Sequence, residues 1–132
     1  MNEPEAIQAM LAAKTIAVIG LSEDASKPSH YVSAFMQAQG AKLLPINPAI
    51  DSVLGEKAYP SLTALPEKPD VVNVFRLPRF IPEIVDEMIA LGLNKLWVQQ
   101  GIVNLEAAAK AEAAGIQVVM DRCIMVEKRF QP

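Results

Sequence analysis

The sequence is poor in the residue types that hold small domains together by covalent bonds or metal ions. Its 132 residues include one cysteine, Cys123, and one histidine, His30. A single thiol cannot form an internal disulfide, and a single histidine cannot supply a histidine-based metal cluster. A chain of this length can be stabilised by apolar burial alone, and a lone cysteine is typical of a reducing compartment such as the cytoplasm.

Long runs of one residue type are also missing. The formal net charge is −3, and no run of lysine and arginine exceeds two residues. This argues against the basic surface that nucleic-acid-binding proteins carry. The apolar runs are far shorter than the ~20 residues of a membrane span. The first five residues, MNEPE, carry negative charge and are unlike a signal or transit peptide. We therefore expect a cytoplasmic protein with neither nucleic-acid nor membrane partners.

The composition that remains is typical of one folded domain. Hydrophobic residues make up 52% of the sequence and charged residues 20%, which is the opposite of the balance found in disordered chains. Because single domains most often have about 100–150 residues, residues 1–132 are predicted to form one domain.

Short apolar segments alternate with helical periodicities along the chain. Five apolar segments are typical of buried parallel strands, and they are residues 16–19, 42–46, 71–75, 95–98 and 116–120. Segments with helical spacing of apolar residues lie before and between them, at residues 5–13, 28–39, 81–91 and 105–114. Asn104 is placed to cap the last of these helices. Residues 49–69 are predicted to be irregular, with a helical turn that starts at Ser61.

Strands that alternate with helices predict right-handed crossovers and a parallel sheet. We therefore predict an α/β fold, namely a Rossmann-like, doubly wound parallel sheet of five strands in three layers, with strand order 3-2-1-4-5. Pro45 lies inside the second strand and cannot donate a backbone hydrogen bond. It predicts that this strand lies at or near a sheet edge.

In open α/β sheets, ligands bind outside the carboxyl ends of the strands, at the point where the strand order reverses. In the predicted order that point lies between the first and fourth strands. The polar and glycine-bearing segments that follow the strands are therefore the candidate binding site. The candidate residues are Gly20, Leu21, Ser22, Ser26, Lys27, Ser29, Asn47, Pro48, Phe75, Arg76, Gln99, Gln100 and Gly101.

The loop after the first strand, residues 20–29, leads directly into a helix. At such a position, backbone N–H groups and the helix dipole can hold phosphate oxygens. Ser22, Ser26 and Ser29 add hydroxyl donors, and Lys27 adds a positive charge. An ordinary solvated connection between strand and helix is the alternative interpretation.

Four other residues near the strand ends also allow a functional and a structural interpretation. Arg76 either pairs with a phosphate or forms a surface salt bridge, and Gly101 either lets a ligand approach the backbone or simply makes a turn. His30 is interpreted as a surface or capping residue, and Cys123 as a buried structural thiol. No catalytic residue is predicted, because no nucleophile with a base and no carboxylate pair is recognisable.

The spacing of glycines argues against the common nucleotide fingerprints. Gly40 is the next glycine after Gly20, so the G-x-G-x-x-G pattern is absent. Asn47 and Pro48 follow the second strand, where dinucleotide-binding domains place an acidic residue for the ribose. The Walker lysine motif is also missing. NAD and ATP are therefore disfavoured as ligands.

With these segments in place, the sequence resembles the CoA-binding domain family in its small stand-alone bacterial form. The N-terminal half of the succinyl-CoA synthetase α subunit shares the fold of this family. The resemblance runs from residue 14 to residue 127 and rests on six segments that occur in the same order. They are IAVIGLS (16–22), PINP (45–48), GEKAYPSL (55–62), DVVNVFR (70–76), QGI (100–102) and MDRCI (120–124).

The resemblance implies that coenzyme A lies over the strand ends. Residues 22–26 would hold the phosphates, residues 47–49 the nucleotide portion, and residues 75–76 and 99–101 the pantetheine arm. The synthetase carries its phosphorylated histidine in a later domain, and Gln100 stands where its Thr-Glu-Gly motif has the acidic residue. The loop after the first strand also lacks the glycine of the synthetase's Thr-Gly pair. The resemblance therefore implies binding of CoA but not the ligase reaction.

Three hypotheses follow from the sequence. The first is non-catalytic binding of a small molecule, coenzyme A or an acyl-CoA. The second is a nucleotide-dependent enzyme, either an NAD(P) oxidoreductase or a ligase subunit that needs a partner chain. The third is a Rossmann-like domain that binds a protein and no nucleotide. The apolar helix faces are also compatible with a homodimer.

Overall fold

The computed structural model describes residues 1–131; Pro132, the last residue of the predicted domain, lies outside them. A parallel sheet is formed by β1 (Thr15–Ile19), β2 (Lys42–Ile46), β5 (Val71–Val74), β6 (Lys95–Val98) and β7 (Gln117–Met120). The α-helices are α1 (Pro4–Leu11), α2 (Pro28–Ala38), α3 (Ile81–Leu91), α4 (Leu105–Ala113) and α5 (Ile124–Arg129). A 3-10 turn, η1 (Pro78–Phe80), precedes α3.

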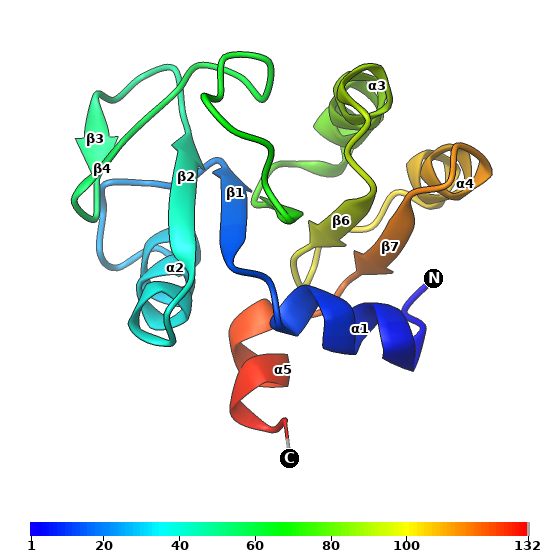
Figure 1. The fold of residues 1–132 in the computed structure, drawn as a ribbon, viewed down its shortest axis with the longest axis horizontal. Coiled ribbons are helices and arrows are strands. Elements are labelled where there is room, and N and C mark those ends of the chain that lie inside the picture. Colours follow the sequence, from blue (N-terminus) through cyan, green and yellow to red (C-terminus); the bar gives the residue numbers. More distant parts are fainter. Residues whose placement is uncertain (132) are drawn as a thin grey trace.

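The sheet lies between two layers of helices, which confirms the predicted Rossmann-like α/β architecture. Helices α1, α2 and α5 cover one face, and α3 and α4 cover the other (Figure 1). Alternate residues of β1 serve the two faces, since Ile16 and Val18 pack with α1 and α2 while Ala17 packs with the α3 side. Burial on both faces explains why the strands are apolar throughout.

The predicted strand order is wrong in one respect. The observed order is β2-β1-β5-β6-β7, so the third strand of the sheet in chain order pairs with β1 and not with β2. In chain order the sheet is therefore 2-1-3-4-5 rather than 3-2-1-4-5. Pro45 supplies the physical reason, because β2 is the edge strand that this proline predicts. The reversal of strand order consequently lies between β1 and β5.

Besides η1, a hairpin and the helix α5 were not predicted from the sequence. Residues 49–69 contain a hairpin of β3 (Ser52–Val53) and β4 (Glu56–Lys57), joined by Leu54 and Gly55, which both have positive φ. The expected turn at Ser61 is present as an N–H···O bond from Ala64 to Ser61. Helix α5 follows β7 and packs against α2, so it becomes part of the layer that borders the strand ends on that side.

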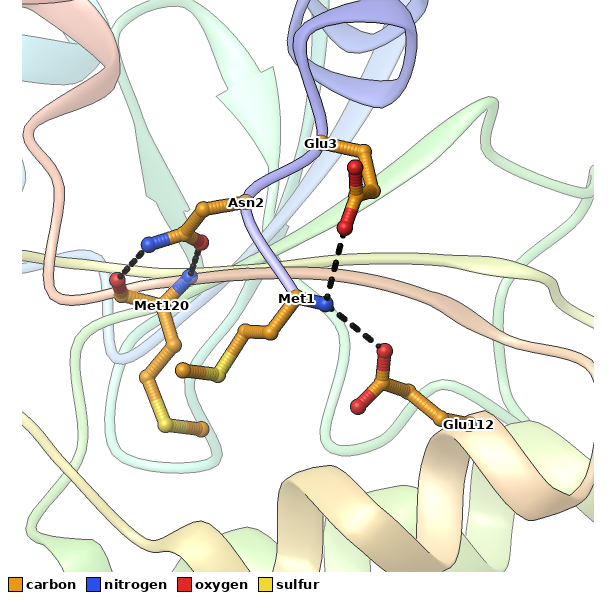
Figure 2. A network of polar contacts seen from close by, with 5 residues as sticks. All are labelled: Met1, Asn2, Glu3, Glu112 and Met120. Carbon is orange, nitrogen blue, oxygen red and sulfur yellow. Dashed lines mark hydrogen bonds and ion pairs between the residues drawn. The ribbon is translucent and has the colours of Figure 1, made fainter.

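The free edge of β7 is covered by the first residues of the chain. The Asn2 amide donates to the Val118 carbonyl. The Asn2 side chain both donates to the carbonyl of Met120 and accepts from its N–H (Figure 2). The amino group of Met1 donates to Glu112 at 2.9 Å, which raises the pKa of that amine. This covering removes the free hydrogen-bonding edge that otherwise invites association.

Candidate functional site

Two adjoining cavities open at the carboxyl ends of the strands. The first, which we call the α3-side cavity, has a volume of about 560 Å³. It is lined by Ile19, Gly20, Ile46, Asn47, Pro48, Pro60, Ser61, Phe75, Arg76, Phe80, Glu83, Ile84 and Glu87. The second, the α2-side cavity, has a volume of about 700 Å³. It is lined by Gly20, Ser22, Lys27, Pro28, Ser29, Tyr31, Val32, Phe75, Arg76, Leu77, Gln99, Gln100, Ile102, Cys123, Met125 and Val126.

Gly20, Phe75 and Arg76 line both cavities and form the junction between them. The junction lies where the strand order reverses, because the chain after β1 leads to α2 on one face of the sheet while the chain after β5 leads to α3 on the other (Figure 1). Doubly wound sheets bind their ligands at this point. The corrected strand order thus moves Phe75 and Arg76 from a flank of the sheet to the reversal itself.

Gly20 is required by the close approach of three strand ends. Its φ is +88°, and a Cβ atom at this position would lie 2.4 Å from the carbonyl oxygen of Phe75. Its N–H donates to the Ile46 carbonyl at 2.9 Å. The glycine therefore allows β1, β2 and β5 to converge at the junction, and its own amide is not free for a phosphate.

The loop between β1 and α2 is held by hydrogen bonds within itself. The Ser22 amide donates to Ser29 Oγ at 3.0 Å, the Asp24 amide donates to Ser22 Oγ at 3.0 Å, and His30 Nδ1 lies 2.9 Å from the Ser22 carbonyl. The loop thus offers fewer free amides than the sequence suggested. Each serine oxygen accepts one bond here and keeps its own hydroxyl hydrogen to donate. Phosphate contacts from this loop would come mainly from side chains.

Three predicted site residues line neither cavity. Leu21 is fully buried. The Ser26 hydroxyl donates a hydrogen bond to the Asp24 carboxylate of the same loop at 2.7 Å. This bond holds the pKa of Asp24 below its ordinary value of 3.8. The Gly101 amide donates to the Asp121 carboxylate at 2.7 Å. In these positions none of the three faces the crevice.

Two other predicted residues line the cavities but use their side chains to hold the strand ends together. The Asn47 side chain donates to the Leu21 carbonyl at 3.0 Å and accepts from the Ala49 amide at 2.9 Å. Gln99 is buried and donates to Asn73 Oδ1 at 2.7 Å. Pro48 and Gln100 are exposed beside them.

Two cations stand at the junction and the α2-side cavity without an acidic partner. The Arg76 guanidinium stacks on the Phe80 ring, 4.1 Å from its centroid, and the ion pairs formed among residues 1–131 include neither Arg76 nor Lys27. The surface salt bridge that was the alternative for Arg76 is therefore not what the structure shows. A guanidinium or ammonium without a carboxylate partner is available to an anionic ligand.

The two cavities differ in charge. Glu83 and Glu87 of α3 line the α3-side cavity, and Glu87 is held in place because it accepts hydrogen bonds from the amide and hydroxyl of Thr63. The residues that line the α2-side cavity include Lys27 and Arg76 but no acidic residue. An anionic group is therefore favoured at the junction and on the α2 side.

Sequence analysis missed one wall of the α2-side cavity. Tyr31 comes from α2, Leu77 follows β5, and Met125 and Val126 come from α5. Cys123 belongs to the same wall; it packs against the hydrophobic core, as a structural thiol does, but it is only half-buried and not fully buried as predicted. The one available signal was Tyr31, a large aromatic residue outside the apolar stripe of the helix predicted at residues 28–39; it is exposed.

Among residues 1–131, no three His, Cys, Asp or Glu side chains are grouped so that they could hold a metal ion. Within the same residues, no helix combines the length and apolar character needed to cross a membrane.

Comparison with known families gives an independent line of evidence. The sequence model of a family described as "CoA binding domain" matches residues 14–129. The chain belongs to the CoA-binding domain family. This confirms the resemblance inferred from the six sequence segments, and it covers β1 through α5.

This chain is similar to small proteins over most of their length and to a short part of a larger ligase. YneT of Bacillus subtilis is 42% identical over 113 residues, which cover 86% of this chain and 84% of YneT. A solved structure from Thermus thermophilus has 40% identity and a TM-score of 0.90, and the match covers 98% of each chain. An ADP-forming acetate–CoA ligase (II) of Archaeoglobus fulgidus is 30% identical over 83 residues, which are 61% of this chain but 12% of the ligase.

Proposed function

We propose that this CoA-binding domain holds coenzyme A or an acyl-CoA across the carboxyl edge of its sheet and catalyses no reaction on it. The observation that carries the proposal is the junction of the two cavities. Gly20, Phe75 and Arg76 line both of them at the reversal of strand order, which is where doubly wound sheets bind nucleotides. Membership of the CoA-binding domain family supports CoA as the nucleotide.

The shape of the crevice suits an extended ligand. CoA has an adenosine portion at one end, a pyrophosphate in the middle and a pantetheine arm at the other end. Each cavity falls within the range of about 300–1,000 Å³ that is typical of small-molecule sites. We place the adenosine portion in the α3-side cavity beside Pro48 and Ser61, and the pantetheine arm in the α2-side cavity beside Gln100 and Cys123.

The pyrophosphate is assigned to the junction because Arg76 lies there and Lys27 lines the adjoining α2-side cavity, both outside the ion pairs formed among residues 1–131. Arg76 and Lys27 supply positive charge, and the hydroxyls of Ser22 and Ser29 can donate hydrogen bonds. Helix α2 begins beside the junction, in the α2-side cavity, without a side-chain cap, so its N-terminal dipole adds to the attraction for an anion.

The test is calorimetry and thermal unfolding of the purified chain with CoA, acetyl-CoA, NAD(H), NADP(H) and ATP. A CoA concentration of 100 times Kd should stabilise the fold by about 2.7 kcal/mol, while the other nucleotides should have little effect. Equal or larger stabilisation by NAD(P)(H) or ATP would favour the nucleotide-dependent enzyme. If millimolar CoA neither binds nor stabilises, the proposal is wrong, and a domain that binds a protein becomes the better hypothesis.

A further inference from the structure

The α2-side cavity has a wall made largely of apolar residues. Its apolar residues come from four separate segments, namely α2, the chain after β5, the chain after β6 and the start of α5. Three of them remain well exposed in the absence of a ligand: Tyr31 is 46% exposed, Leu77 54% and Val126 42%. Apolar side chains that surround a concavity and are left in contact with water mark a binding surface.

The polar and apolar groups of this cavity come from different segments. Ser22, Lys27 and Ser29 belong to the loop and helix start after β1, and Arg76 follows β5. Cys123, Met125 and Val126 belong to the segment after β7. The cavity therefore combines a cationic side with an apolar side, and no acidic residue lines it.

We propose that the apolar side receives the acyl chain of a short-chain acyl-CoA, so that the domain binds acyl-CoA thioesters more tightly than free CoA. This inference rests on the proposed function, because it needs the pyrophosphate at Arg76 and Lys27 to direct the arm toward α5. Free CoA ends in a thiol and would leave Leu77, Ile102 and Val126 in contact with water. A thioester adds an uncharged carbonyl and methylene groups that can cover them.

A small molecule suits this surface better than a protein partner does. The apolar residues line a cavity of about 700 Å³ that continues into the cationic junction, whereas protein interfaces are larger and flatter. An acyl-CoA matches both parts at once, since it joins an anionic centre to an apolar tail.

The first test is calorimetry with CoA, acetyl-CoA, butyryl-CoA and hexanoyl-CoA under identical conditions. Since a fully buried methylene is worth about 0.8 kcal/mol, each added methylene should lower Kd by roughly two- to fourfold while the chain fits the cavity. Equal Kd values for CoA and butyryl-CoA would overturn this inference and leave the proposed function intact. Absence of binding by all four compounds would overturn both.

The second test changes Leu77, a residue of the apolar wall that is exposed enough to be replaced without disturbing the core. Leu77→Ser should reduce the ratio of the CoA and butyryl-CoA Kd values by at least threefold, because a serine side chain offers the acyl chain little apolar contact. Leu105→Ser is the matched control, because Leu105 is 63% exposed and lines neither cavity. If both variants keep the wild-type ratio, the acyl chain does not lie on this wall.

Cys123 provides a third measurement because it is the sole cysteine and lines the same wall. Its alkylation by iodoacetamide can be followed by mass spectrometry with saturating desulfo-CoA or saturating S-butyl-CoA, neither of which has a thiol that consumes the reagent or a thioester that acylates the cysteine. S-butyl-CoA should slow alkylation at least fivefold more than desulfo-CoA does. Equal protection by both ligands would contradict an acyl chain beside Cys123.

Discussion

The two cavities at the strand ends share their floor but differ in the helices that wall them. Both use Gly20, Phe75 and Arg76. Helix α3 contributes Glu83 and Glu87 to one cavity, whereas α2 and the start of α5 contribute Lys27, Cys123 and Val126 to the other.

The comparison shows how one sheet can orient an asymmetric ligand. The strand order and the junction glycine position the crevice, and under the proposed function the flanking helices decide which end of the ligand each half accepts. A ligand with a pyrophosphate in the middle and an apolar arm at one end is expected to bind in one direction only. The predictions below test this difference between the halves.

The largest effect is expected at the junction that both cavities share. Gly20→Ala places a Cβ against the Phe75 carbonyl in a backbone conformation with φ +88°, and it should lower the free energy of unfolding by about 3 kcal/mol or more. Urea-induced unfolding measures this. Gly115→Ala is the control, because φ there is +86° but no atom lies within 4 Å of the added Cβ. Equal losses in the two variants would show that close approach at the junction is unimportant.

The next largest effect is expected from the cation at the junction. Arg76→Ala should weaken CoA binding roughly 10- to 100-fold, because a charge-assisted hydrogen bond contributes about 1.5–3 kcal/mol. Calorimetry measures the change. Arg79→Ala is a matched control, since Arg79 also stacks on Phe80, at 4.8 Å, but lines neither cavity. An unchanged Kd for Arg76→Ala would show that the pyrophosphate does not bind at the junction.

A smaller effect, an increase in CoA affinity, is expected from a change in the α3-side cavity. Glu83→Gln removes a negative charge near the proposed adenosine site, so CoA, which carries a 3′-phosphate, should bind about two- to fivefold more tightly at low salt. Dephospho-CoA should gain less. Glu106→Gln, an exposed change outside both cavities, is the control. If Glu83→Gln weakens CoA binding, the nucleotide does not lie as proposed.

The smallest effect is expected at the tip of the loop after β1. The hydrogen bond from Ser26 lowers the pKa of Asp24 from its ordinary 3.8, so the associated stabilisation is present above that pH and is lost as the pH falls through the folded-state pKa. Ser26→Ala should raise the pKa of Asp24 toward 3.8 in an NMR titration and leave the Kd of CoA unchanged. A clear loss of CoA affinity would show that Ser26 contributes to CoA binding after all.

The parts of the fold that the sequence predicted are those with a local physical signal. Apolar segments buried on both faces identified β1, β2, β5, β6 and β7, and Asn104 caps α4 as expected by accepting from the Ala107 amide. The order of the strands depends on which one pairs with β1, and apolar segments do not encode that choice. Pro45 did carry the signal for an edge, and it argued against the order that was predicted.

The site was predicted as far as the strand ends define it. Residues that directly follow β1, β2, β5 and β6 line the crevice, because all carboxyl ends of a parallel sheet meet at one edge. The sequence could not show that the Gly101 amide donates a hydrogen bond to the Asp121 carboxylate, or that the Ser26 hydroxyl donates one to the Asp24 carboxylate. Nor could it predict the wall from α5, a six-residue helix whose position depends on tertiary packing.

The most direct test of the account is to map two fragments of CoA separately by amide chemical shifts in ¹⁵N-labelled protein. We predict that 3′,5′-ADP shifts Ser61 and Glu83 in the α3-side cavity, and that pantetheine shifts Cys123 and Val126 in the α2-side cavity. Intact CoA should shift both sets together with Arg76. If both fragments shift the same set, or if the two sets are exchanged, the proposed orientation across the junction is contradicted.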